Sequence, residues 1–94
     1  MYIEDIIWLP HIVDKLAWKH HVLPREVEDI LFGKPFYRKV QKGHIPGEDF
    51  YAALGPTESG RYLIVFFVYK TTREALLISA RDMSKQERRR YERR

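Results

Sequence analysis

The fold of this chain is decided by the stretch RYLIVFFVYKTTREALLISAR, residues 61–81. It contains two apolar runs, Tyr62–Tyr69 and Ala75–Ala80, separated by the short polar segment Lys70–Glu74. The first run lacks polar–apolar alternation and is rich in Val, Ile, Phe and Tyr, which favours a strand covered on both faces. The two runs predict a central β-hairpin with helices on at least one face. Polar side chains at the ends of this hairpin are the first candidates for function.

Length and composition indicate one globular domain spanning residues 1–94. The sequence is 45% hydrophobic and 14% aromatic, which supports an ordered core rather than disorder. It contains no cysteine, which excludes disulfides and thiolate metal sites and is compatible with a cytoplasmic protein. The N-terminus lacks the basic region of a signal peptide, and no apolar run reaches the ~18 residues of a membrane span. We therefore expect no membrane association.

Charge is distributed unevenly along the chain. The net charge is +4, but residues 1–32 contain three basic and six acidic side chains, whereas residues 33–94 contain fourteen basic and seven acidic ones. A basic surface over the sheet and the C-terminus suggests a polyanionic partner, most often nucleic acid. A basic surface that only aids solubility, or one that binds an acidic protein, remains an alternative.

Periodicity and turn signals predict the remaining elements. They indicate a short strand or arm at 2–8, an amphipathic helix at 10–20, a second helix at 24–32 closed by Gly33 as its C′ residue, and strands at 35–42 and 48–54. Ser84 and Glu87 have capping-box spacing and begin a charged C-terminal helix. The order predicts an α+β fold with two N-terminal helices packed on a four-stranded antiparallel sheet, followed by a C-terminal helix.

Three blocks of the sequence carry a family resemblance. Lys19-His20 closes the first helix ahead of Glu26-Val27, Gly47-Glu48 precedes a strand ending in Ala53-Leu54-Gly55, and Ile78-Ser79-Ala80-Arg81 precedes Glu87-Arg88-Arg89 and Tyr91. Together these blocks resemble the BrnT family of type II toxins over nearly the whole chain. The resemblance implies a RelE-like fold, RNA cleavage that blocks translation, and a cognate DNA-binding antitoxin. It leaves open a homo-oligomer or a toxin–antitoxin heterotetramer.

The chain departs from the usual family pattern at three positions. Members typically carry Arg where this sequence has Phe50 and often carry Arg where it has Leu76. The glycine that usually follows Lys-His is His21 here. If the two arginines polarise the scissile phosphate, this chain is a weak nuclease or an inactive relative, since losing one transition-state donor costs ~3–4 kcal/mol.

Metal-free RNA cleavage requires a base for the 2′-OH, an acid for the leaving oxygen and cations for the charged phosphorane. Glu48 is the candidate base, with an ordinary exposed glutamate as the alternative. Arg81 is the best candidate phosphate clamp, unless it only pairs with nearby acids. Arg61 should lie near Arg81 at the same edge of the hairpin, where the two cations form a candidate anion site for RNA unless they are only solvated. Lys19 matches the family's Lys-His pair and is a second candidate for phosphate binding.

Several further residues are candidates for contacts with RNA. Tyr51 is a possible general acid, Tyr91 a base-stacking residue, and His20 either an RNA contact or a buried structural histidine. Arg88 and Arg89 suit an RNA backbone or an acidic antitoxin. The four histidines show no metal-ligand spacing, so we expect no metal and no cofactor. The leading hypothesis is an endoribonuclease; the second is a toxin relative that binds RNA or an antitoxin without cutting.

Overall fold

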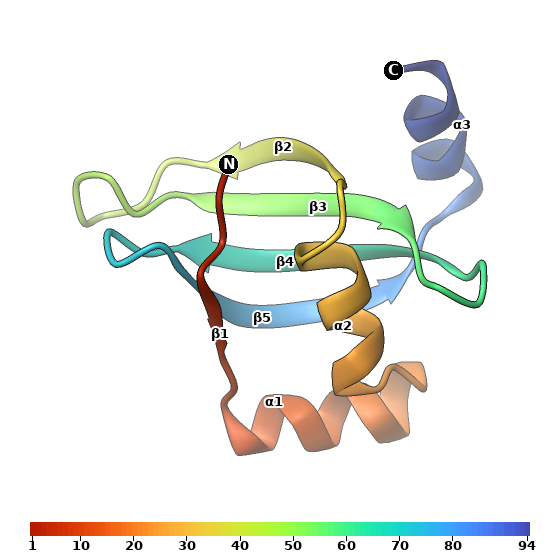
Figure 1. Cartoon of the computed structure of the whole chain (residues 1–94), viewed down its shortest axis with the longest axis horizontal. Coiled ribbons are helices and arrows are strands. Elements are labelled where there is room, and N and C mark those ends of the chain that lie inside the picture. The colour runs from red at the N-terminus through yellow and green to blue at the C-terminus, as the bar shows by residue number, and fades with distance from the viewer.

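The computed structural model describes all residues from 1 to 94 and shows a mixed α+β architecture (Figure 1). Its elements in chain order are β1 (Asp5–Ile7), α1 (Pro10–Lys15) continuing as the π-helical turn η1 (Leu16–His20), α2 (Pro24–Leu31), β2 (Phe36–Gln41), β3 (Phe50–Pro56), β4 (Tyr62–Tyr69), β5 (Glu74–Asp82) and α3 (Lys85–Arg93). The predicted central hairpin is confirmed as β4 and β5.

The sheet has five strands in the order β1-β5-β4-β3-β2, so the prediction of a four-stranded sheet is wrong by one strand. The four later strands pair antiparallel, as predicted, whereas β1 pairs parallel with the outer edge of β5. Strand β1 has only three residues, too few to display an alternating pattern. Its side chain Ile6 is buried, and its place beside β5 depends on packing between distant parts of the chain.

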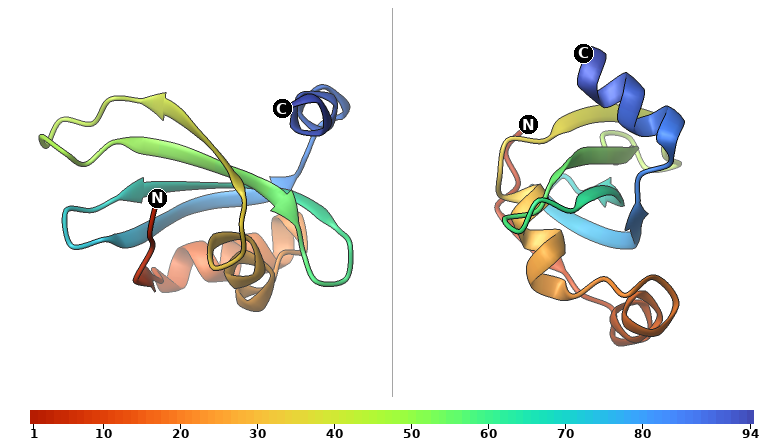
Figure 2. Two further views of the ribbon diagram at one scale, coloured as in Figure 1. Left: turned by 45° about the horizontal axis from the view of Figure 1, so that its top comes forward. Right: turned by 90° about the vertical axis from the view of Figure 1, so that its right-hand side faces the viewer.

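One side of the sheet, the helix face, is covered by α1, η1 and α2 (Figure 2). It holds the larger core cluster, with fourteen buried residues. Val65 and Phe67 from β4 and Leu77 from β5 are fully buried there, against Val27 and Ile30 of α2. This layer contributes most of the apolar burial and stabilises the molecule.

The other side of the sheet, the open face, is covered only by α3, which lies at one end of it (Figure 2). Its core cluster has four buried residues: Ala52, Leu54, Ile64 and Tyr91. Phe66 packs beside this cluster but stays partly exposed. The strand β4 is therefore not fully covered on both faces, contrary to what its composition suggested, although helices cover one face as predicted. Part of the open face remains accessible.

Two helix ends show how local chemistry sets the element boundaries. The capping box predicted for α3 is confirmed, since Ser84 Oγ accepts the Glu87 N–H at 3.1 Å and Glu87 Oε1 accepts the Ser84 N–H at 2.8 Å. Gly33 directly follows the C-cap Phe32 of α2 and so occupies the predicted C′ position, although its φ is not positive. Gly33 is instead required by close approach: a Cβ there would lie 2.6 Å from the carbonyl oxygen of Asp29.

Candidate nucleic-acid interface

The carboxylate of Glu48 lies at the end of the sheet formed by the β2–β3 loop and the β4–β5 turn. Lys70 Nζ donates to Glu48 Oε1 at 2.8 Å, while Thr71 donates to Oε2 from its backbone N–H at 3.1 Å and from its hydroxyl at 3.4 Å. The Lys70 ammonium, followed by the Thr71 N–H, lowers the pKa of Glu48 below its ordinary value. The side chain is only 8% exposed. Glu48 is thus an ionised carboxylate that also ties two loops together.

Phe50, Val68 and Leu76 form one row across three strands beside this carboxylate. Phe50 is paired with Val68, and Val68 with Leu76. Since Phe67, Ala75 and Leu77 belong to the helix-face core, the neighbouring Val68 and Leu76 point to the open face. Strands lie ~4.8 Å apart, which places Phe50 and Leu76 about 10 Å from one another. The two positions at which the family typically carries arginine therefore lie on one surface, next to Glu48.

Arg81 lies toward the opposite end of the open face, where β5 leads into α3. Its guanidinium makes two parallel hydrogen bonds to Glu87, at 2.7 and 3.0 Å, and lies 5.5 Å from the centre of the Phe66 ring. The Arg81 contact, aided by the Ser84 N–H, lowers the pKa of Glu87 to about 2. Arg81 is therefore held in place while its side chain remains 37% exposed.

Arginine and tyrosine side chains of α3 and β4 continue this basic end of the open face. Arg88 stacks over Tyr62 with its guanidinium carbon 3.8 Å from the ring centre, and Tyr62 contacts the buried Tyr91 edge to face. Arg89 is exposed on the same helix. The predicted candidates Arg81, Arg88, Arg89 and Tyr91 thus lie together, although Tyr91 packs against the sheet instead of presenting a free ring.

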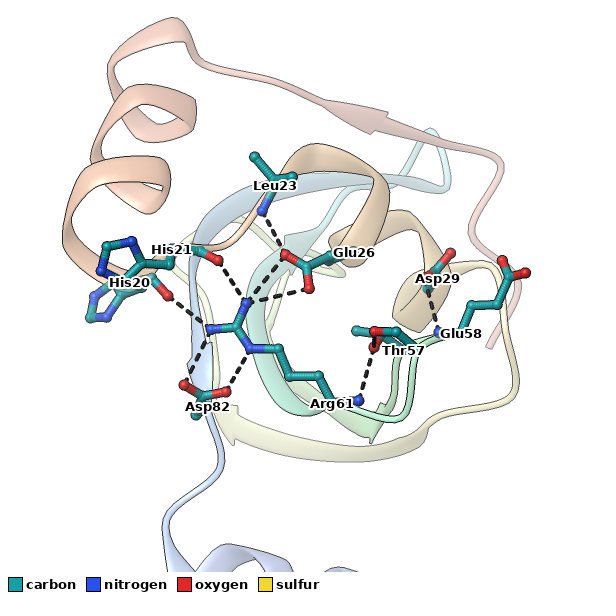
Figure 3. Close-up of polar contacts among 10 residues, drawn as sticks. His20, His21, Leu23, Glu26, Asp29, Thr57, Glu58, Arg61 and Asp82 are labelled. Carbon is teal, nitrogen blue, oxygen red and sulfur yellow. Dashed lines mark hydrogen bonds and ion pairs between the residues drawn. The ribbon is translucent and has the colours of Figure 1, made fainter.

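Arg61 is positioned by a different set of contacts on the helix side of the molecule (Figure 3). It donates to Asp82 at 2.7 and 3.2 Å, to Glu26 at 3.2 Å, and to the carbonyl oxygens of His21 and His20 at 2.7 and 2.9 Å. Asp82 is the main cause of its raised pKa. Arg61 directly precedes β4 and lies opposite the end of β5, as predicted. However, its donors are occupied by the junction of η1, α2 and β5, and it forms no shared anion site with Arg81.

Three other predicted residues also lie away from the open face. Lys19 and His20 lie at the end of η1, and the main-chain carbonyl of His20 accepts a hydrogen bond from Arg61. Tyr51 packs on the helix face, where its ring stacks on Phe67 with centroids 6.0 Å apart. The structure therefore does not bring the four proposed catalytic residues Glu48, Arg81, Lys19 and Tyr51 into one site.

His21 occupies a backbone position that favours glycine. This residue adopts the left-handed conformation, with φ 53°, at the end of η1. Glycine reaches this conformation without steric cost, whereas other residues strain there. The departure at His21 therefore concerns backbone geometry, and its carbonyl is still aimed at Arg61.

The open face carries two polar sites separated by apolar and aromatic side chains. Ile64, the partner of Arg81, is four residues from Val68 along β4, a distance of about 13 Å at ~3.3 Å per residue. Glu48 and Arg81 therefore cannot contact the same phosphate. Lys70 and Phe66 were not among the predicted site residues, because the pattern around Lys70 is typical of a turn and Phe66 lies within an apolar run typical of a buried strand.

Cationic side chains lie beside aromatic rings on the open face. No group of three or more His, Asp or Glu side chains comes together in a way that would hold a metal. None of the helices is long and apolar enough to cross a membrane. The accessible surface that combines cations with aromatic rings is the open face, which is suited to a strand of RNA.

The chain matches one protein-family model over most of its length. Residues 8–87 match the model of BrnT, the ribonuclease toxin of type II toxin–antitoxin systems. The search among curated proteins gives no match. The matched segment runs from just after β1 to the capping box of α3, so it includes both polar sites of the open face.

Proposed function

The chain belongs to the BrnT family of ribonuclease toxins of type II toxin–antitoxin systems, with an antitoxin as partner and RNA as target, and we propose that it is a metal-independent endoribonuclease. In this proposal it cuts mRNA in the cytoplasm and so inhibits translation. The RNA lies along the open face between Glu48 and Arg81. The observation that supports this placement is the ionised Glu48 carboxylate at the end of an accessible, basic and aromatic sheet face.

The chemistry we propose is attack by the RNA's own 2′-hydroxyl. Glu48 accepts the 2′-OH proton as the new O–P bond forms, the bond from phosphorus to the 5′-oxygen breaks, and that oxygen leaves with a proton. The products are a 2′,3′-cyclic phosphate and a 5′-hydroxyl. Lys70, 2.8 Å from Glu48, is the nearest cation for the charged phosphorane and can donate the proton to the leaving oxygen.

Arg81 and Arg88 bind the RNA backbone farther along the face. The bidentate pair with Glu87 fixes the direction of the Arg81 guanidinium, and the Tyr62 ring fixes that of Arg88. Their role in this proposal is to align the strand, which reduces the entropy lost when the scissile phosphate reaches Glu48. Arg61 stabilises the fold in this proposal, because its five N–H groups already donate to protein acceptors.

The test is a Glu48→Gln variant assayed for RNA cleavage in the presence of a chelator. Removal of a general base should lower the cleavage rate by about 10²- to 10⁴-fold. Glu58→Gln, on an exposed loop, is the matched control and should cut like the wild type. Wild-type cleavage that needs an added divalent ion, or equal cleavage by Glu48→Gln, would overturn the mechanism.

A second candidate function, RNA binding without cleavage, is favoured by the apolar row Phe50–Val68–Leu76. These side chains place no cation where the family typically has two, on the same surface as Glu48. The variant Phe50→Arg/Leu76→Arg separates the two functions. If it cuts RNA and the wild type does not, the native chain is a binding-only relative. If the wild type cuts and the variant gains nothing, Glu48 and Lys70 suffice.

A further inference from the structure

We propose that Phe50 and Phe66 form a base-stacking platform that selects single-stranded RNA and positions a nucleotide beside Glu48. The inference rests on the proposed function, because it names how the RNA target is held. It concerns a residue, Phe50, at which this chain departs from the usual family pattern. The platform would replace a charge contact at that position with a contact to a base.

The two rings stack on one another on the open face of the sheet. Their centroids are 6.0 Å apart and their planes differ by 22°, so both rings present similar orientations. They come from adjacent strands, since Phe66 is paired with Ala52 two residues beyond Phe50. Both rings are partly exposed, and the helix on the open face, α3, lies at one end of that face (Figure 2). Their location on paired strands keeps the platform rigid.

The charges around the platform favour a nucleic-acid base over an apolar protein segment. The Arg81 guanidinium lies 5.5 Å from the Phe66 ring centre. Arg38 is paired with Ala52, which belongs to the open-face cluster, so Arg38 flanks the platform on the side of β2. Residues 85–94 at one end add six basic and two acidic side chains. Aromatic rings on a sheet, bordered by cations, are a recurrent way to hold single-stranded RNA: rings stack on bases and cations contact phosphates.

The location of the platform links binding to the proposed chemistry. Phe50 is two residues from Glu48 and lies in the row next to it, whereas Phe66 lies nearer to Arg81. A base stacked on Phe50 would bring its ribose toward the Glu48 carboxylate, and the following phosphates would run toward Arg81. Since every base has a π-face, the platform predicts a strong preference for single strands and a weak preference for sequence.

The test measures binding of short RNAs with methylated 2′-hydroxyls, which cannot undergo 2′-attack. Binding is therefore read out whether or not the chain is a nuclease. The wild type should bind a single-stranded RNA about tenfold more tightly than the same strand with an abasic site at its centre. Phe50→Leu and Phe66→Leu should remove this difference, whereas Phe50→Tyr and Phe66→Tyr, which retain the aromatic face, should keep it.

Phe32→Leu is the matched control, because Phe32 is 51% exposed and follows α2, outside the open face. It should bind both RNAs like the wild type, and all variants should show the circular dichroism spectrum of the folded protein. Equal binding of intact and abasic RNA by the wild type would overturn the platform. So would leucine variants that keep RNA affinity but lose the cognate antitoxin, which would show that this face binds a protein. Base-dependent binding without cleavage would support the platform and contradict only the enzymatic mechanism.

Discussion

Phe66 and Phe67 are neighbours in β4, yet they belong to surfaces with different tasks. Phe67 is fully buried on the helix face among the fourteen residues of the larger cluster, whereas Phe66 lies partly exposed on the open face beside Arg81. A strand alternates its side chains, so one apolar run can supply both a core and a binding surface. The difference teaches that the function of an apolar residue here depends on which layer covers it.

The largest expected effect separates these two residues directly. Phe67→Ala should lower the free energy of unfolding by about 3–5 kcal/mol, because it leaves a cavity in a closed core. Phe66→Ala should cost only about 1–2 kcal/mol, since water reaches that site and no sealed cavity forms. Urea unfolding of both variants measures the contrast. Equal losses would mean that the open face is as closely packed as the helix face.

The second-largest expected effect is a difference in stability between variants of Arg61 and Arg81, which both lie at the same end of the β4–β5 hairpin. Arg61→Ala should destabilise the protein by about 2–3 kcal/mol, because it leaves Glu26, Asp82 and two carbonyl groups without their donor. Arg81→Ala should cost about 1 kcal/mol, since its pair with Glu87 is partly solvated. Thermal melts give the stabilities and RNA titrations give the affinities.

The same pair distinguishes stability from binding. At a temperature where both variants are folded, Arg61→Ala should bind RNA like the wild type and Arg81→Ala should bind more weakly. Weaker RNA binding by Arg61→Ala, with unchanged binding by Arg81→Ala, would show that Arg61 contacts RNA. Arg61→Lys is an informative companion, because a single ammonium cannot reproduce the forked contacts to Asp82 and the two carbonyls.

Much of the fold could be predicted from local patterns, but the rest depends on distant contacts. The apolar runs gave β4 and β5, and the Ser84–Glu87 spacing gave the start of α3. The place of β1 in the sheet could not be predicted, because three residues are too few to show an alternating pattern. Its pairing partner, β5, also lies about seventy residues away in the sequence. The register shift in β5 opposite Phe66 and Phe67 was also invisible in the sequence. It lets Leu77 and Ala80 share the helix face despite odd spacing.

The candidate site was less predictable than the fold, because the sequence shows which residues are charged but not which partners they contact. Arg61 and Arg81 looked equivalent as cations at one end of a hairpin, and only the fold shows that Arg61 is enclosed by acceptors. Glu48 looked exposed next to a glycine turn, although it is 8% exposed and bound by Lys70. Tyr51 could not be assigned to a face before the helices were placed. The family resemblance supplied the positions of Phe50 and Leu76, and the register showed that they share a row.

A smaller effect concerns the link between the open face and α3. Glu87→Gln should reduce stability by about 1 kcal/mol at pH 7, because it weakens both the helix cap and the pair with Arg81. Glu87 has a pKa of about 2 in the folded protein and an ordinary value of 4.5. Its contribution is therefore complete above pH 4.5 and is lost as the pH falls toward 2. Denaturant unfolding of both proteins over this range should show their stabilities converging.

The exposed Glu92 provides the control for this pH dependence. It forms a looser, exposed pair with Arg88, at 3.5 Å, and its replacement by Gln should change stability by less than about 0.5 kcal/mol. If Glu92→Gln matched Glu87→Gln, general helix charge rather than the Arg81 contact would account for the loss. A constant difference between wild type and Glu87→Gln from pH 7 to pH 2 would contradict the assignment.

The smallest expected effect tests whether α3 contributes charge to the open face. Arg88→Gln and Arg89→Gln should each reduce the slope of log affinity against log salt concentration by about 0.7 for single-stranded RNA, provided each contacts one phosphate. Arg25→Gln, at an exposed position of α2, should leave the slope unchanged because it lies on the helix side. Arg88 is oriented by the Tyr62 ring, whereas Arg89 is exposed. A loss of slope for Arg88 alone would place the RNA against the sheet, a loss for both would place it across α3 as well, and no loss for either would assign these arginines to the antitoxin.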